Sequence, residues 1–303
     1  PCCGVGKPGH DRPATAPAAG GAAAVIALDL ERPAALAMDA DDTLYVGGDY
    51  VALLTSDGSV LARSPDLPAR VTALAAAGDR VYAACGDHVV ELVREQGRLA
   101  VANEWTPLGQ RAMLTSVAVV GERVALADFG NRTVWVFDTD ARLLQQLESA
   151  LPQGYIIPSP YMDVAIAADG TVWVANTGRH TLESFAADGT PGRSWGKASM
   201  APEGFAGCCN PSHFALTPDG AFVTTEKGLP RLKRYTAAGE FDRVIAGPEA
   251  FSHKAVGLDV AVDSRGRVLV LDPGAGVVRV FDQAPASTAA EQQEAQDHVQ
   301  PRN

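Results

Sequence analysis

Two adjacent cysteines and a nearby histidine form the segment of this sequence best suited to chemistry. Cys208 and Cys209 are followed by Asn, Pro and Ser and then by His213. Consecutive Cα atoms lie ~3.8 Å apart, below the ~4.4–6.8 Å of relaxed disulfides, so a disulfide here would be strained and comparatively easy to reduce. Two free thiols beside a histidine would instead suit a soft metal ion. The structural alternatives are packing of both cysteines within the loop, or a disulfide from one of them to Cys2 or Cys3.

A second candidate group combines two carboxylates with the same histidine. Asp163, His213 and Asp259 recur at intervals of roughly 50 residues, as equivalent positions of a repeat would. Such a trio can bind a borderline or hard divalent metal ion, or hold the histidine as a general base. The alternative is that these side chains cap strand ends by hydrogen bonding to exposed backbone groups.

Three further residues complete the predicted ligand or redox site. Glu226, Lys227 and His253 fall on loops that the expected fold places on the same face as the two cysteines. Lys227 also begins a basic cluster that continues with Arg231, Lys233 and Arg234. This cluster could bind an anion, but its alternation along a strand favours a solvated outer edge.

Residues equivalent to Glu226 recur along the sequence at intervals of roughly 45 residues, and most of them have a structural interpretation. Asp or Asn at the start of a loop accepts hydrogen bonds from its own backbone in an Asx-turn, which predicts capping at Asp128, Asn176 and Asp272. Glu226 and Cys85 form that turn less readily, so capping explains these two residues less well.

Composition and missing motifs exclude several classes of function. With 25 Lys and Arg against 36 Asp and Glu, the net charge of −11 repels DNA and RNA. No stretch approaches the ~20 apolar residues of a membrane-spanning helix. The sequence contains no CxxCH haem site, phosphate-binding glycine motif, GxSxG turn or HExxH helix, so we expect no nucleotide or haem cofactor.

Short strands must position these residues, because apolar runs of four or five residues alternate with turns along the chain. Residues 162–195, 213–245 and 258–281 share an order of strand, Asp-Gly-like turn, strand, polar loop and strand, and weaker copies precede them. The second strands of six repeats begin at Thr43, Arg80, Arg123, Thr171, Ala221 and Arg267. Six repeats of roughly 45 residues, with four strands each, predict an all-β, six-bladed β-propeller.

One repeat resembles a known family. Residues 128–138 read DFGNRTVWVFD, which resembles the NHL repeat, and residues 176–185 and 272–281 are similar. The resemblance extends over residues 24–283 and implies a six-bladed NHL-like propeller. NHL propellers include lyases, relatives of lactonase-like hydrolases and interaction modules, so the fold alone does not select a function.

The resemblance to peptide-amidating lyases of this fold implies a role for the second candidate group. In such an enzyme Asp163, His213 and Asp259 would hold a metal ion or perform acid–base chemistry. The family uses several histidines around the channel, whereas only His213 occupies the ring of strand-opening positions here. This departure weakens the implied lyase chemistry.

The predicted organisation has one closed domain and two extensions. Residues 24–283 form the propeller, and Val25–Leu30 supply the fourth strand of the last blade and close the ring. Residues 1–23 form a flexible Pro-, Ala- and Gly-rich arm, and residues 284–303 form a flexible polar tail.

These observations predict an NHL-type binding module with a ligand site at the mouth of the channel. The cysteine pair would be its soft-metal or thiol-redox centre, and the partner would be a small ligand or a protein. One alternative is a metal-assisted lyase or hydrolase, and another is an interaction scaffold without a small ligand. Enzymatic activity and oligomeric state stay open, and we expect an extracytoplasmic location, periplasmic or secreted.

Overall fold

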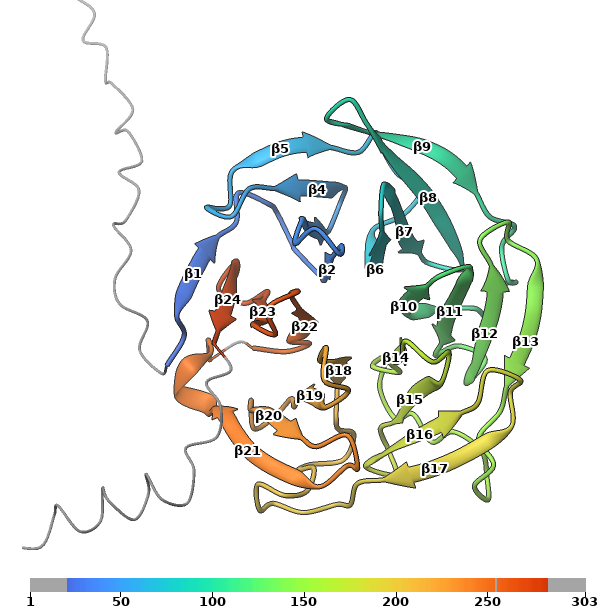
Figure 1. Ribbon diagram of the computed structural model, residues 1–303, viewed down its shortest axis with the longest axis vertical. Coiled ribbons are helices and arrows are strands. Elements are labelled where there is room, and N and C mark those ends of the chain that lie inside the picture. The colour runs from blue at the N-terminus through green and yellow to red at the C-terminus, as the bar shows by residue number, and fades with distance from the viewer. Residues whose placement is uncertain (1–20, 254, 283–303) are drawn as a thin grey trace, which may run out of the picture.

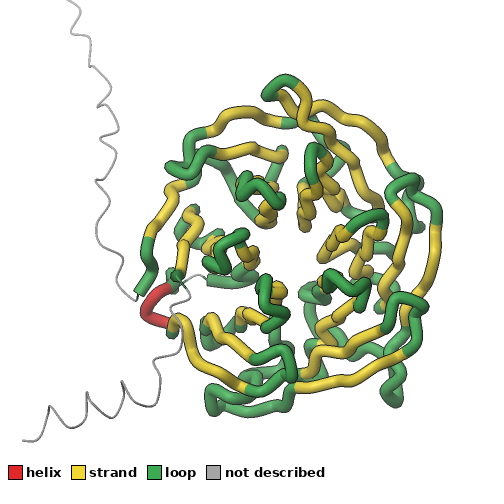
Figure 2. The backbone as a smooth tube through the Cα atoms, in the orientation of Figure 1, coloured by secondary structure: helices red, strands yellow, loops and turns green. Residues whose placement is uncertain are grey.

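Six four-stranded antiparallel sheets are arranged in a ring around a central axis (Figure 1). The computed structural model describes residues 21–253 and 255–282. Over these ranges the only helical element is the short 3-10 helix η1 (Pro248–Ala250), and strands and loops make up the rest (Figure 2). No helix in the same ranges is long and apolar enough to cross a membrane. The prediction of an all-β, six-bladed propeller is therefore confirmed.

The strands follow the predicted repeat, and the second strands begin within one residue of the predicted positions. From blade 1 to blade 6, the first strands, which line the channel, are β2 (Ala35–Met38), β6 (Val71–Ala77), β10 (Leu114–Val120), β14 (Val164–Ile166), β18 (His213–Leu216) and β22 (Asp259–Val262). The second strands are β3 (Leu44–Gly47), β7 (Arg80–Cys85), β11 (Arg123–Asp128), β15 (Val172–Asn176), β19 (Phe222–Thr225) and β23 (Val268–Asp272). The third strands are β4 (Val51–Leu54), β8 (His88–Glu95), β12 (Thr133–Asp138), β16 (Thr181–Phe185), β20 (Leu232–Tyr235) and β24 (Val277–Phe281). The outermost strands are β5 (Val60–Arg63), β9 (Arg98–Glu104), β13 (Leu143–Leu147), β17 (Pro191–Trp195), β21 (Phe241–Ala246) and β1 (Ala24–Ala27).

The N-terminal strand closes the ring, as predicted. β1 pairs antiparallel with β24 from Ala24 opposite Val280 to Ala27 opposite Val277, so the last blade contains both ends of the domain (Figure 1). The strand register ends at Ala27, one more backbone hydrogen bond joins the N–H of Leu28 to the carbonyl of Gly276, and β1 is shorter than the predicted Val25–Leu30. The proposed arm and tail lie almost wholly outside the described residues.

The core lies between neighbouring blades, and this explains the apolar runs in the sequence. Second strands such as β15 are buried at every residue, because both faces of each sheet pack against the adjacent blades. Outermost strands such as β17 are mostly exposed. Blades 4 and 5 are joined by aromatic packing, with the rings of Trp173 and Phe222 4.8 Å apart.

One hydrogen bond recurs where the second strand of a blade ends. In blades 3 to 6, a carboxylate or amide side chain at that point accepts a backbone N–H from the loop that enters its own blade. The pairs are Met113 to Asp128 (3.0 Å), Ile156 to Asn176 (2.9 Å), Ala206 to Glu226 (2.7 Å) and Ser252 to Asp272 (2.7 Å). Asp128 and Asp272 also accept the local N–H groups of Asn131 and Ala275, as in the predicted turns. These side chains therefore fix the entering loops that carry the candidate site.

Candidate functional site

The channel mouth contains a small polar cavity to which all six blades contribute. It has a volume of about 70 Å³, and its walls include Asp163, His213 and Asp259 together with Leu36, Thr72 and Thr115. The register of the repeats thus correctly predicts that these three candidate ligands surround one opening.

The two channel aspartates tie neighbouring blades together. Asp163 accepts the backbone N–H of Phe214 at 2.7 Å, and Asp259 accepts that of Leu36 at 2.7 Å. Each bond joins the start of one first strand to the first strand of the next blade. The capping role predicted as the alternative is therefore present for both residues.

Burial shapes the electrostatics of this cavity. It raises the pKa of Asp163, and it raises the pKa of Asp259 to about 6, against the opposing influence of nearby His213. The charge of Asp163 adds to the upward shift of the pKa of Asp259. His213 Nδ1 is buried and, in the described part of the chain, has no hydrogen-bond partner. The two carboxyl groups of this cavity consequently hold their protons more tightly than exposed carboxyl groups do.

The cysteine pair lies in the loop that leads into β18. Both cysteines are free thiols, Cys208 exposed and Cys209 buried with 2% of its surface accessible, and their Sγ atoms are 3.1 Å apart. Gly207, with φ of +75°, precedes them in the left-handed conformation that glycine adopts most easily. The structure therefore holds two sulfurs together, one facing solvent and one facing the protein.

A lysine and a serine surround the inner sulfur. Ser159 Oγ donates to Cys209 Sγ at 3.3 Å, and Lys227 Nζ donates to Ser159 Oγ at 2.5 Å. Lys227 Nζ also lies 4.4 Å from the centroid of the Tyr161 ring, in a cation–π contact. Tyr161 also contacts His213, whose ring meets it edge-on with centroids 5.6 Å apart. Tyr161 therefore lies between the thiol pair and the channel cavity.

This environment gives the two thiols different acidities. Burial opposes ionisation of Cys209, but hydrogen bonds from Ser159, Lys227 and Cys208 outweigh it and lower the pKa of Cys209. The hydrogen bond to Cys209 raises the pKa of Cys208. A thiolate at Cys209 that accepts a hydrogen bond from the Cys208 thiol satisfies both shifts. The pair can thus hold a single proton between two sulfurs.

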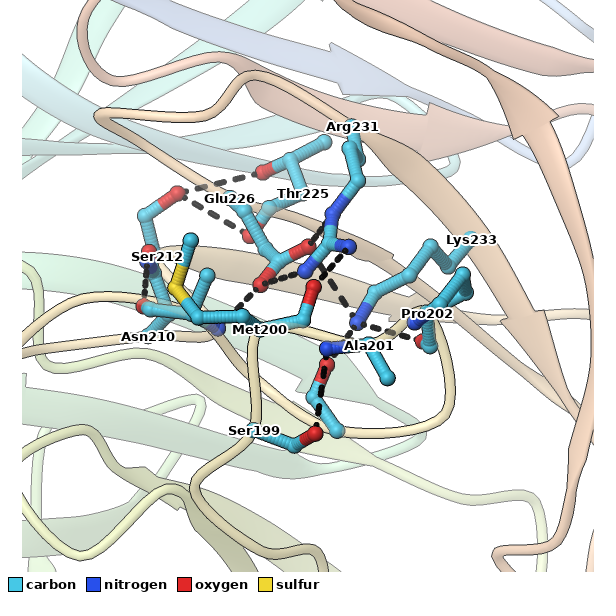
Figure 3. A network of polar contacts seen from close by, with 12 residues as sticks. Ser199, Met200, Ala201, Pro202, Asn210, Ser212, Thr225, Glu226, Arg231 and Lys233 are labelled. Atoms are coloured by element: carbon cyan, nitrogen blue, oxygen red, sulfur yellow. Dashed lines mark hydrogen bonds and ion pairs between the residues drawn. The ribbon is translucent and has the colours of Figure 1, made fainter.

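Glu226 lies beneath this loop within a buried ion-pair network (Figure 3). Its side chain is fully buried and accepts two hydrogen bonds from Arg231, at 2.5 and 2.9 Å, while Lys233 Nζ lies 3.2 Å away. Arg231 also donates to the carbonyl of Met200. All of these contacts join Glu226 to other groups of the protein, so Glu226 stabilises the loop.

The prediction that the basic cluster is exposed to solvent is wrong for Lys233. Its side chain is fully buried, and Nζ donates to the carbonyls of Gly204 at 2.6 Å and Pro202 at 3.2 Å. Burial lowers the pKa of Lys233 to about 8, against the opposing influence of Glu226. Strand alternation suggested an exposed edge, but the long loop before β18 covers this strand and takes its cations as partners.

The structure brings most, not all, of the predicted site together. One group consists of Cys208, Cys209 and Lys227. Tyr161 connects this group to His213, which lines the channel cavity together with the two aspartates. His253 is exposed in the loop before β22, outside this group. Over the described ranges, no three His, Cys, Asp or Glu side chains converge closely enough to hold a metal ion. The three-ligand metal centre therefore stays a prediction.

Sequence reasoning missed Ser159 and Tyr161. Both lie in the irregular loop that enters blade 4, which the repeat register places on the correct face without specifying its contacts. Asn210 was also missed as an anchor: it donates to the carbonyl of Ala206 at 2.6 Å and accepts the N–H of Lys227 at 2.9 Å. Its position next to Cys209 and before proline was the only available signal.

Comparisons with known proteins identify the fold and no family. No model of a protein family matches the chain, and no curated protein matches it. Among solved structures, the WD40 β-propeller domain of Doa1 is similar with a TM-score of 0.57 and 15% identity, covering 84% of this chain and 79% of that one. A protein of unknown function from Bacteroides thetaiotaomicron VPI-5482 has a TM-score of 0.62 and 15% identity, with coverage of 88% and 72%. These likenesses show that the chain is a β-propeller, and the NHL assignment stays a prediction.

Proposed function

We propose that this propeller is a binding module whose channel-mouth cysteine pair captures a thiophilic metal ion. The supporting observation is the contact between Cys209 Sγ and the Ser159–Lys227 pair, with the second thiol 3.1 Å away. Thiolate sulfur is the ligand that soft metal ions prefer. A positive charge that favours the thiolate reduces the proton competition that a metal ion must overcome.

The asymmetry of the pair suits capture from solution. Cys208 is exposed and can meet an incoming ion first, while Cys209 supplies the more acidic sulfur behind it. The loop that carries them is anchored at both ends, by Glu226 to the N–H of Ala206 and by Asn210 to Lys227. Little reorganisation of the backbone is then needed to present the two sulfurs together.

Cadmium titration of the reduced full-length protein tests this function, with thiolate-to-metal ultraviolet absorbance as the readout. Because Cys2 and Cys3 form another adjacent pair, the Cys2→Ser/Cys3→Ser variant is the starting protein. We expect it to bind one Cd²⁺ and to lose that binding when Cys208→Ser and Cys209→Ser are added. Cys85→Ser is the matched control, because Cys85 is a buried cysteine whose pKa burial raises to about 11.

Unchanged cadmium binding without Cys208 and Cys209 would contradict the proposal. A mass decrease of two hydrogens on treatment with a small disulfide, with no cadmium binding, would instead favour the thiol-redox alternative. Cadmium binding that depends on Asp163 and Asp259, and not on the cysteines, would favour the metal-assisted lyase or hydrolase.

A further inference from the structure

A second cavity lies between blades 2 and 3, among residues of their outer strands and loops. Its volume is about 210 Å³, and its walls include Trp105, Leu108, Trp135, Phe137 and Leu143. Leu143 is 50% exposed, so one wall reaches the protein surface. The cavity is lined mainly by apolar and aromatic side chains, unlike the polar cavity of the channel.

The aromatic wall is held in place by packing. The ring of Trp105 lies 5.4 Å from that of Phe137 and 6.0 Å from that of Tyr82, the latter edge-on. Trp105 is only 4% exposed, and its backbone N–H donates to the carbonyl of Val89. This indole cannot easily turn toward another partner.

Two nitrogens of the lining residues lack hydrogen-bond partners among the described residues: Trp105 Nε1 and His88 Nε2. Both belong to side chains that are more than nine-tenths buried. Glu104 Oε1 lies 3.3 Å from His88 Nε2, but the pair does not have hydrogen-bond geometry. Trp135, also in the wall, does have a partner, because its Nε1 donates to Asp128 at 3.1 Å. Buried polar groups are nearly always paired, so the unpaired indole N–H of Trp105 in the wall of this cavity requires an explanation.

The chemistry of the indole defines the partner that is missing. His88 already lies between two carboxylates, with Nδ1 2.8 Å from Asp87 Oδ1 and Nε2 3.3 Å from Glu104 Oε1. The indole N–H of Trp105 can only donate, so its missing partner is an acceptor. The oxygen of a hydroxyl group can accept this hydrogen bond.

We propose that this cavity binds a single-ring aromatic molecule that carries a hydroxyl group, with phenol as the simplest example. A dry apolar cavity of ~150 Å³ is large enough to bind benzene, so a cavity of about 210 Å³ accommodates one ring with a polar substituent. The ring packs against Trp105, Trp135 and Phe137, and the hydroxyl oxygen accepts the indole N–H of Trp105. This site is independent of the cysteine pair and of the function proposed for it.

Binding of phenol and toluene to the full-length protein, followed by ligand-detected NMR titration, tests the proposal. The two probes have similar rings, but only phenol has a hydroxyl group. Trp105→Phe keeps an aromatic ring and removes the indole N–H, so we expect roughly tenfold weaker phenol binding and toluene binding within about twofold of the parent. Leu108→Trp fills the cavity and should abolish binding of both probes.

Trp173→Phe is the matched control, because it makes the same change between blades 4 and 5 and should leave both affinities unchanged. The proposal would be overturned if phenol bound without saturation, or if Trp105→Phe weakened toluene as much as phenol. It would also be overturned if a folded Leu108→Trp variant still bound phenol with the parent affinity. Thermal unfolding of each variant establishes that the fold is retained.

Discussion

Lys227 acts on Cys209 both directly and through the hydroxyl group of Ser159. The ammonium group donates to Ser159, which donates to the sulfur, so a positive charge stabilises the thiolate inside the loop. An opposite charge at such a distance typically lowers a pKa by about 1–3 units. The acidity of this cysteine is consequently a property of a neighbouring side chain that the sequence places 18 residues further on.

Replacing this lysine tests that dependence. We expect Lys227→Met to raise the pKa of Cys209 by about one unit, because the thiolate loses its cationic neighbour. Thiolate ultraviolet absorbance, followed against pH in the Cys2→Ser/Cys3→Ser protein, measures the shift. Lys197→Met removes an exposed lysine that pairs with Glu203 and should leave the titration unchanged. An identical titration curve for Lys227→Met would show that Ser159 and Cys208 alone set the acidity.

The raised pKa of Asp259 predicts that the stability of the protein depends on pH. Burial raises the pKa of Asp259 to about 6, above its value in the unfolded chain, so the native state binds the proton more tightly. The stabilisation of the native state by this proton binding is fully present below about pH 4, and it is lost as the pH rises through 6. The free energy of unfolding of Asp259→Asn relative to the parent should therefore rise by up to about 3 kcal/mol between pH 4 and pH 7.

Denaturant unfolding of both proteins at several pH values measures this difference. Asp169→Asn is the control with the opposite sign, because the backbone N–H of Thr171 lowers the pKa of Asp169 and its stabilisation is lost as the pH falls. A constant difference between parent and Asp259→Asn across this range would contradict the prediction.

At the scale of elements, the long loop before β18 depends on one buried carboxylate. Glu226 accepts the N–H of Ala206 and neutralises Arg231 and Lys233, which in turn bind carbonyl groups of the same loop. We expect Glu226→Gln to cost about 3 kcal/mol of unfolding free energy, because two buried cations lose their counter-charge. In the Glu226→Gln variant, amide hydrogen exchange should accelerate within residues 197–210, because the loop has lost its anchor. Glu240→Gln, at an exposed turn, is the control and should change neither quantity.

The repeat made the elements predictable, and the irregular loops limited the prediction of the site. A two-residue strand period and a fixed register located the second strands and placed Asp163, His213 and Asp259 at one opening. The contacts of Ser159 and Tyr161 depend on how a single loop bends, and no repeat encodes that. Lys233 was misplaced for a related reason, since the loop that covers it comes from an earlier part of the chain.

At the scale of the whole molecule, ring closure depends on four residues of β1. Ile26 is buried among residues of blades 1 and 6, including Leu36 and Val278. We expect Ile26→Ala to cost about 2–4 kcal/mol, because it leaves a cavity between two blades. Ala27→Ser, an exposed neighbour in the same strand, should change stability by less than about 0.5 kcal/mol. Equal urea midpoints for the two variants would show that β1 adds nothing to the closed ring.

The pairing of β1 with β24 also sets the order of events during biosynthesis. β1 leaves the ribosome before any other strand of the ring, yet its partner is the last strand to emerge. Until then the nascent chain exposes two unpaired strand edges, β1 near its N-terminal side and the newest strand at its growing C-terminal end, and such edges can pair with other chains. Translation that stalls in blade 6 would therefore release chains able to join one another, whereas completed chains seal themselves.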